Sequence, residues 1–231
     1  GSLGISYVLL DDTVALLSSE VDELGLSGAD QVAVARRYGS DAGLWKTVGF
    51  AAANALTRCL FDRAGFRPDD SADSIGQMTP RPEDHIGMIG LFTPLIGRIL
   101  ATGARLTVVE LKAELVGSSD GYRVTLDPGA LADCTKVIST STLLLNDTLD
   151  RMLACCHQAR WFAMVGPSAG CLPDALFARG VTLVGGTWVD HREAFVAALK
   201  GGEPLGDHAS KSALTAANYP GWRALLQRAS A

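Results

Sequence analysis

The residues whose types most directly suggest chemistry lie in the segment MVGPSAG, Met164–Gly170. The segment follows an apolar run and matches G-x-S-x-G, the nucleophile-elbow pattern of α/β-hydrolases, with Ser168 as the nucleophile. Three features argue against a hydrolase. Only one clear strand follows Ser168 to carry the rest of a triad, Pro167 restricts the sharp turn of an elbow, and no HGGG-type segment precedes it. We interpret the turn as a ligand contact or as a simple strand-to-loop connection.

A second group of polar residues lies in the segment STSTLLLNDTLDRML. Four consecutive hydroxyl residues, Ser139 to Thr142, end an expected strand, and Asn146 and Thr148 precede an expected helix. Asparagine and aspartate are ordinary residues at helix starts, where their side chains cap backbone N–H groups. Four hydroxyl residues in a row are more than capping requires. The pattern therefore indicates a contact with a polar ligand.

A nucleotide site is the third chemistry to consider. Glu110 ends an expected strand and follows Gly90, which ends the preceding strand, at the distance typical of the acidic residue that binds a ribose hydroxyl. The glycine fingerprint that approaches a pyrophosphate is absent, because Phe92 and Pro94 occupy that turn. We therefore do not expect classical NAD binding. A smaller nucleotide or an S-adenosylmethionine-like ligand stays open.

Metal-ligand spacing is not found among the cysteines and histidines. The chain has 5 cysteines without regular spacing, which argues against a disulfide framework and for a reducing compartment. Cys155, Cys156 and His157 are adjacent, and adjacent residues on a helix point in different directions. No pair of histidines has the H-x-x-x-H spacing of a zinc site. Spacing alone therefore predicts no metal site.

Composition excludes several classes of protein. The net charge of −5 argues against nucleic-acid binding, which usually needs a basic surface. The apolar runs are far shorter than the roughly 20 residues that a membrane span requires, and the start does not resemble a signal peptide. We expect a cytoplasmic protein that binds neither nucleic acid nor membrane, with homodimerisation left open.

The polar residues must be positioned by alternating strands and helices. Apolar β-like runs alternate with segments of helical character, a pattern typical of a parallel sheet covered on both faces. The expected strands are His85–Phe92, Arg105–Leu111, Lys136–Ser141, Trp161–Gly166 and Val181–Gly186. Ligands of such sheets bind beyond the carboxyl ends of the strands, which is where the polar residues above are found. We predict a Rossmann-like, doubly wound, mostly parallel α/β domain over residues 81–231.

The first part of the chain has a different texture. The runs ISYVLL and TVALLS predict a β-hairpin, and two helices are expected over Ala29–Gly39 and Leu44–Gly65. Residues 67–82 are rich in proline, aspartate and serine and read as a linker. We therefore predict a smaller α+β domain with its linker over residues 1–80. Asn54, a polar residue within the alanine-rich helix, is either a satisfied core amide or faces the second domain.

Several segments together resemble the putative heavy-metal chelation family, a group of uncharacterised prokaryotic proteins. They are GFAAANAL, the run from Ile86 to Leu111, STSTLLLNDTLDRML and the run from Phe162 to Phe195. The resemblance implies an enolase N-terminal-like α+β domain, a Rossmann-like domain and a ligand site in the cleft between them. The positions that match are Asn54, Phe92, Thr93, Pro94, Glu110, Thr140, Ser141, Thr142, Asn146, Thr148, Gly166, Pro167, Ser168, Gly185 and Gly186.

Residues and resemblance lead to one main hypothesis and two others. The main hypothesis is a protein that binds a small polar ligand, a heavy metal or a metal chelator, in the interdomain cleft, with a metal ion as the candidate cofactor. The oxygen-rich candidate residues suit a hard cation, an anion or a polar metabolite better than a soft metal. The alternative is a nucleotide- or S-adenosylmethionine-dependent enzyme that uses the same cleft, although no catalytic residue is predicted. A non-catalytic interaction module is the third hypothesis.

Overall fold

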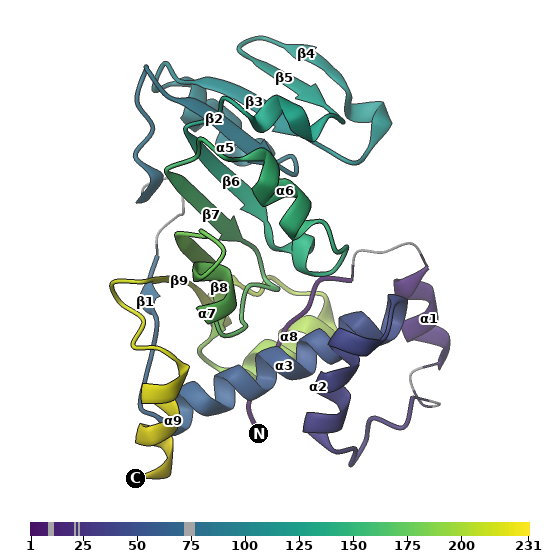
Figure 1. The fold of residues 1–231 in the computed structure, drawn as a ribbon. Helices are drawn as coiled ribbons and strands as arrows, with labels where there is room; N and C mark the ends of the chain where they lie inside the picture. The colour runs from purple at the N-terminus through teal and green to yellow at the C-terminus, as the bar shows by residue number, and fades with distance from the viewer. Residues whose placement is uncertain (9–11, 21, 23, 72–76) are drawn as a thin grey trace.

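A computed structural model describes residues 1–8, 12–20, 22, 24–71 and 77–231 (Figure 1). The strands are β1 Asp69–Asp70, β2 His85–Ile89, β3 Arg105–Val109, β4 Gly117–Ser119, β5 Tyr122–Thr125, β6 Lys136–Thr140, β7 Trp161–Val165, β8 Leu183–Val189 and β9 Ala209–Thr215. The α-helices are α1 Thr13–Glu20, α2 Gln31–Ser40, α3 Gly43–Arg63, α5 Thr93–Leu100, α6 Leu149–Cys155, α7 Asp174–Phe177, α8 Arg192–Gly201 and α9 Trp222–Ser230. Short 3-10 helices are η1 Ala113–Leu115, η2 Pro128–Leu131, η3 Ser141–Leu144 and η4 Gly206–His208.

The strands form one mixed sheet whose centre is parallel. Its order is β1-β9-β8-β7-β6-β2-β3-β5-β4, with 9 strands. All pairs from β5 through β3, β2, β6 and β7 to β8 are parallel, whereas β1, β9 and β4 pair antiparallel at the edges. The predicted α/β class with a mostly parallel sheet is confirmed. The five predicted strands are β2, β3, β6, β7 and β8.

Helices cover both faces of the sheet because successive strand residues point to opposite sides. In β6, Ile138 packs in a cluster with Ile96 and Ile99 of α5. Its neighbour Val137 packs in the opposite cluster, together with Met152 of α6. That second cluster also receives side chains from α3, α7 and α9, namely Phe50, Phe61, Leu176 and Leu225. Connections that leave β2 and β6 therefore pass to opposite faces.

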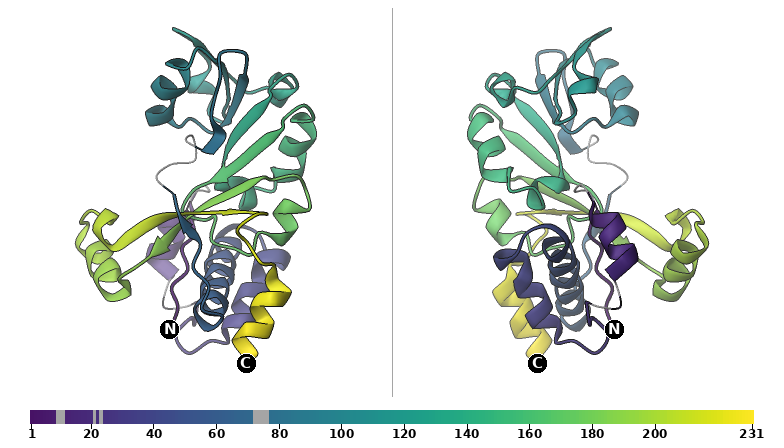
Figure 2. Two further views of the ribbon diagram at one scale, coloured as in Figure 1. Left: turned by 90° about the vertical axis from the view of Figure 1, so that its left-hand side faces the viewer. Right: turned by 90° about the vertical axis from the view of Figure 1, so that its right-hand side faces the viewer.

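Helix α3 is part of the same hydrophobic core as the sheet. The Phe61 ring lies 6.4 Å from the Trp188 ring of β8 and 6.5 Å from the Tyr219 ring, measured between centroids. Figure 2 shows α2, α3 and α9 together on one side of the sheet and α8 standing apart from them. The predicted division of the chain near residue 80 stays a prediction.

One sequence prediction about the first part of the chain is wrong. The run TVALLS, expected as the second strand of a hairpin, belongs to helix α1. Residues 1–8 have no regular secondary structure, and residues 9 and 10 of the expected first strand lie outside the described residues. A short apolar run without clear periodicity does not distinguish strand from helix, which explains the error. Within the described residues, no helix is long and apolar enough to cross a membrane.

A buried carboxylate joins the starting ends of the parallel strands. Asp84, 2% exposed, pairs with Lys136 at 2.7 Å and accepts hydrogen bonds from Thr135 Oγ1 at 2.8 Å and the Arg81 backbone N–H at 2.9 Å. Burial by itself raises the pKa of Asp84, but the hydrogen bonds from Lys136, Thr135 and Arg81 outweigh it and hold the pKa below its ordinary value. The ion pair thus stabilises the end of the sheet opposite the strand exits.

We predict that Asp84→Ala lowers the free energy of unfolding by about 3 kcal/mol at pH 7, because Lys136 is left as a partly buried, unpaired charge. Because the folded-state pKa is depressed, the stabilisation is present above the ordinary pKa of about 4 and is lost as the pH falls through the folded value. The difference in the free energy of unfolding between wild type and Asp84→Ala therefore becomes smaller below about pH 4. Urea denaturation across pH measures this. Glu83→Ala, at an exposed neighbour, is the control and changes stability by less than about 0.5 kcal/mol.

Candidate functional site: a cleft at the strand exits

A cleft of about 790 Å³ opens at the carboxyl ends of β2, β3, β6 and β7. It lies where the strand order reverses, because β3 follows β2 on one side while β6 lies on the other. Open α/β sheets bind their ligands at this position, since the flanking loops diverge to opposite faces and leave a crevice. The crevice is therefore the candidate functional site.

Nine of the predicted site residues line this cleft. They are Phe92, Glu110, Thr140, Ser141, Thr142, Asn146, Thr148, Gly166 and Pro167. Six others do not: Asn54, Thr93, Pro94, Ser168, Gly185 and Gly186. Sequence reasoning missed several residues of the lining, among them Tyr7, Leu91, Leu111, Lys112, Leu115 and Met152. Most of these are apolar or sit in loops, so their types carried no chemical signal.

The exit of β6 forms the polar wall of the cleft. Thr140 Oγ1 accepts hydrogen bonds from the Thr142 backbone N–H at 3.2 Å and the Thr142 hydroxyl at 3.1 Å, which caps η3. Asn146 Oδ1 accepts from the Thr148 hydroxyl at 2.6 Å. The Asn146 side-chain NH2 has no hydrogen-bond partner in the described part of the chain. This wall is thus locally ordered and still offers donors.

Glu110 positions the loops that leave β2 and β3. Its Oε1 accepts the Leu91 backbone N–H at 2.6 Å, and its Oε2 accepts the Leu111 backbone N–H at 2.9 Å. Both carboxylate oxygens therefore already serve backbone donors at the two strand exits. An acidic residue that binds a ribose would present its oxygens to the ligand instead.

The turn after β7 packs against the start of η3. Gly166 has φ +145°, and a Cβ atom there would lie 2.3 Å from Ser141 Oγ. Only glycine permits both this backbone conformation and this approach. The contact closes one side of the cleft.

Two predicted residues form a buried cluster behind that turn. Ser168 is fully buried, and its Oγ accepts the Tyr7 backbone N–H at 2.7 Å. Asn54 Nδ2 donates to the carbonyl oxygens of Ile5 at 2.7 Å and Ser168 at 3.0 Å. Together they attach the segment before α1 to the turn and to α3. The Ser168 hydroxyl lies beneath that segment and does not line the cleft.

The remaining predicted residues have other positions. Gly186 in β8 lies against the same turn, because a Cβ atom there would approach the Ala169 carbonyl oxygen to 2.4 Å. A Cβ atom at Gly185 would lie 3.1 Å from Val165 Cγ1. Thr93 and Pro94 begin α5 and are exposed. Gly185 and Gly186 therefore allow β8 to pack closely against β7 and the turn that follows it, and neither lines the cleft.

Helices α2 and α3 support the polar wall from behind. Lys46 of α3, 8% exposed, forms an ion pair with Asp147, whose φ is +58°. The Tyr38 hydroxyl donates to the Leu144 carbonyl oxygen at 2.7 Å, and burial is the main reason that the pKa of Tyr38 rises to about 12. The segment 141–148 is thereby held in place by residues of the first part of the chain.

The fold and cleft define a mixed α/β protein with a crevice at the switch point of its parallel strands. A family model matches residues 73–217, more than half of the chain, and the chain belongs to that family, described as putative heavy-metal chelation (DUF364). No curated protein gives a significant match.

Two solved structures of the same family share the fold. One is a protein of unknown function from Pyrococcus horikoshii, with a TM-score of 0.65, 22% identity and coverage of 79% of this chain and 73% of that chain. The other, also of unknown function, is from Desulfitobacterium hafniense DCB-2, with a TM-score of 0.61, 18% identity and coverage of 79% of this chain and 72% of that chain. At such identities the likeness establishes the fold alone.

We predict that Gly166→Ala lowers the free energy of unfolding by more than about 2 kcal/mol, because it adds backbone strain to a clash with Ser141. Urea denaturation measures the effect. The double variant Gly166→Ala/Ser141→Gly recovers only part of the loss, since it removes the clash and leaves the strain. Gly39→Ala is the control, because a Cβ atom there meets nothing within 4 Å. If Gly166→Ala were as stable as Gly39→Ala, the close approach of Gly166 to Ser141 would not matter for stability.

Proposed function

We propose that the cleft binds a small polar organic molecule that carries its own metal donors, such as a chelator or its metal complex. The observation that supports this most is the convergence of nine predicted residues, from the exits of four strands, on one cleft at the switch point. A volume of about 790 Å³ lies within the range of small-molecule sites.

The lining indicates what such a ligand presents. The exit of β6 supplies hydroxyl and amide groups from Thr140, Thr142, Asn146 and Thr148. The opposite side is largely apolar and includes Phe92, Leu91, Leu111 and Leu115. A ligand with a polar face and an apolar or planar body would satisfy both walls, because buried polar groups need partners and apolar surface is favourably removed from water.

Direct coordination of a heavy metal by the protein does not fit the cleft residues. Of the residues that the structure describes, Glu110 is the sole acidic residue of the lining and neither cysteine nor histidine lines it, while both Glu110 oxygens accept backbone N–H groups. Among the described residues there is no group of three or more His, Cys, Asp or Glu that could hold a metal ion. Heavy metals prefer sulfur and nitrogen ligands. The donors for the metal therefore come from the organic ligand.

The rival function is a nucleotide- or S-adenosylmethionine-dependent enzyme. Its support is the strand order β5-β3-β2-β6-β7-β8, which is that of dinucleotide-binding sheets, and the position of Glu110 after β3. Two contacts disfavour it. Glu110 already accepts the Leu91 backbone N–H, so that donor is not free for a phosphate. The bulky Phe92 directly precedes α5 and occupies the place where a phosphate would approach the helix N-terminus.

Thermal unfolding with nickel(II), the planar chelator pyridine-2-carboxylate, its neutral 2:1 nickel complex, ATP and S-adenosylmethionine separates the two functions. We expect stabilisation by pyridine-2-carboxylate or its nickel complex, of about 2.7 kcal/mol at one hundred times the dissociation constant, and none by nickel alone. Thr142→Val keeps the shape, removes one hydroxyl from the polar wall and weakens binding about tenfold. Thr125→Val, a partly exposed threonine of β5 outside the cleft lining, is the matched control.

Two results would contradict the proposal. Stabilisation by nickel alone that persists in Thr142→Val would indicate a metal site elsewhere. Stabilisation by ATP or S-adenosylmethionine, without any effect of pyridine-2-carboxylate or its nickel complex, would favour the enzyme.

A further inference from the structure

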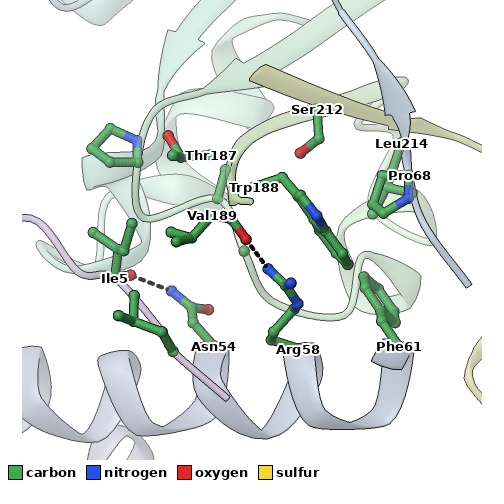
Figure 3. A pocket seen from close by; sticks show the side chains of 15 residues that line it. Ile5, Asn54, Arg58, Phe61, Pro68, Thr187, Trp188, Val189, Ser212 and Leu214 are labelled. Atoms are coloured by element: carbon green, nitrogen blue, oxygen red, sulfur yellow. Dashed lines mark hydrogen bonds between the residues drawn. The ribbon is translucent and has the colours of Figure 1, made fainter. Parts of the chain in front are cut away.

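A second, smaller pocket lies on the other side of the turn at residues 166–170 (Figure 3). Its volume is about 40 Å³, whereas one water needs roughly 10–15 Å³, so it has room for a group of about three or four heavy atoms. Residues of α3, the segment 3–5, the turn, β8 and β9 line it. Pro167 lines both this pocket and the cleft.

The pocket contains a hydrogen-bond acceptor without a donor. Asn54 is 3% exposed, and its Oδ1, which is buried, has no hydrogen-bond partner among the described residues. The orientation of the amide is determined by its other end, because Nδ2 faces the carbonyl oxygens of Ile5 and Ser168, which accept and cannot donate. A buried acceptor without a partner is costly, so a donor at this end of the pocket that reached Asn54 Oδ1 would be stabilised.

Other residues of the pocket lining supply donors. Arg58 stacks on the Trp188 ring, with Cζ 3.6 Å from its centroid, and uses Nη1 and Nε for Val189 and Asp62. Because a guanidinium has five N–H groups, it retains others for a ligand. The hydroxyls of Thr187 and Ser212 have no hydrogen-bond partner among the described residues. The charge of Arg58 is already matched by Asp62 at 2.8 Å.

We infer that this pocket binds a small uncharged group with both a donor and an acceptor, namely a primary carboxamide or urea. The NH2 group donates to Asn54 Oδ1, and the carbonyl oxygen accepts from Arg58 or a hydroxyl. A carboxylate has no proton for Asn54 Oδ1 and would repel it. An ammonium group would lie near Arg58 without a carboxylate left to balance it.

Three isosteric probes test the inference, since acetamide, acetate and acetone each have four heavy atoms. Ligand-observed NMR titrations measure their dissociation constants. We expect acetamide to bind at least about tenfold more tightly than acetate or acetone, because only acetamide donates to Asn54 Oδ1. Equal binding of all three, or no binding of acetamide, overturns the inference. So does a crystal soaked in acetamide that shows only ordered water beside Asn54.

A variant that partly fills the pocket provides a second test of the inference. Gly170 lines the pocket, and a Cβ atom there would lie 3.4 Å from Asn54 Cγ, an ordinary contact distance. Gly170→Ala is therefore expected to fold, as circular dichroism would verify, and to weaken acetamide binding at least tenfold. Gly97→Ala is the control, because its added Cβ meets nothing within 4 Å. Undiminished binding to Gly170→Ala also overturns the inference.

This inference is independent of the function proposed for the cleft. Thr142→Val changes the polar wall of the cleft and leaves acetamide binding unchanged, because Thr142 does not line the small pocket. Loss of acetamide binding in Thr142→Val would place the amide in the cleft and refute a separate site.

Discussion

The reversal of strand order between β2 and β6 is the constraint on which the site depends. After β2 the chain crosses one face of the sheet through α5, and after β6 it turns to the opposite face through η3 and α6. The two connections cannot pack against each other, because each must bury its apolar side on its own face. Space is therefore left between them at the carboxyl ends of the strands. The loops that follow the strands line this space, and the polarity of their side chains determines which ligands fit it.

Side chains at this end of the sheet satisfy backbone groups that ligands satisfy in many related sheets. Glu110 accepts the N–H groups of Leu91 and Leu111, where a dinucleotide site would leave backbone donors free for phosphate. Asn54 and Ser168 similarly satisfy the backbone of the segment before α1. At the strand exits, Glu110 thus occupies backbone N–H groups of the kind that bind phosphate in dinucleotide-binding proteins. The cleft in consequence offers side-chain hydroxyls and amides in preference to backbone N–H groups.

Features of the fold that depend on residues close together in the sequence could be predicted, whereas contacts between residues far apart in the sequence could not. The apolar runs from His85 to Gly186 identified the five parallel strands, because burial on both faces leaves a continuous apolar signal. Polar residues at the strand ends, such as Thr140 and Glu110, were found because parallel strands bring their carboxyl ends together. The run TVALLS was misassigned, since six residues show no clear period. The partners of Ser168 and Lys46 could not be predicted, because Tyr7 and Asp147 are far away in sequence and near only in the folded chain.

The contrast between the family description and the donor set has a physical explanation in the charge of the lining. A protein that holds a bare divalent cation surrounds it with several anionic or strongly basic ligands, because the ion loses its hydration shell on entry. In the part of the chain that the structure describes, the lining has one acidic residue, Glu110, and one lysine, Lys112. A neutral or weakly charged complex, whose organic ligand already replaces the hydration shell, needs only hydrogen bonds and apolar contact from the protein. The hydroxyls of η3 and the apolar loops after β2 and β3 could supply those two contributions, which is the reason for proposing a chelated metal and not a free one.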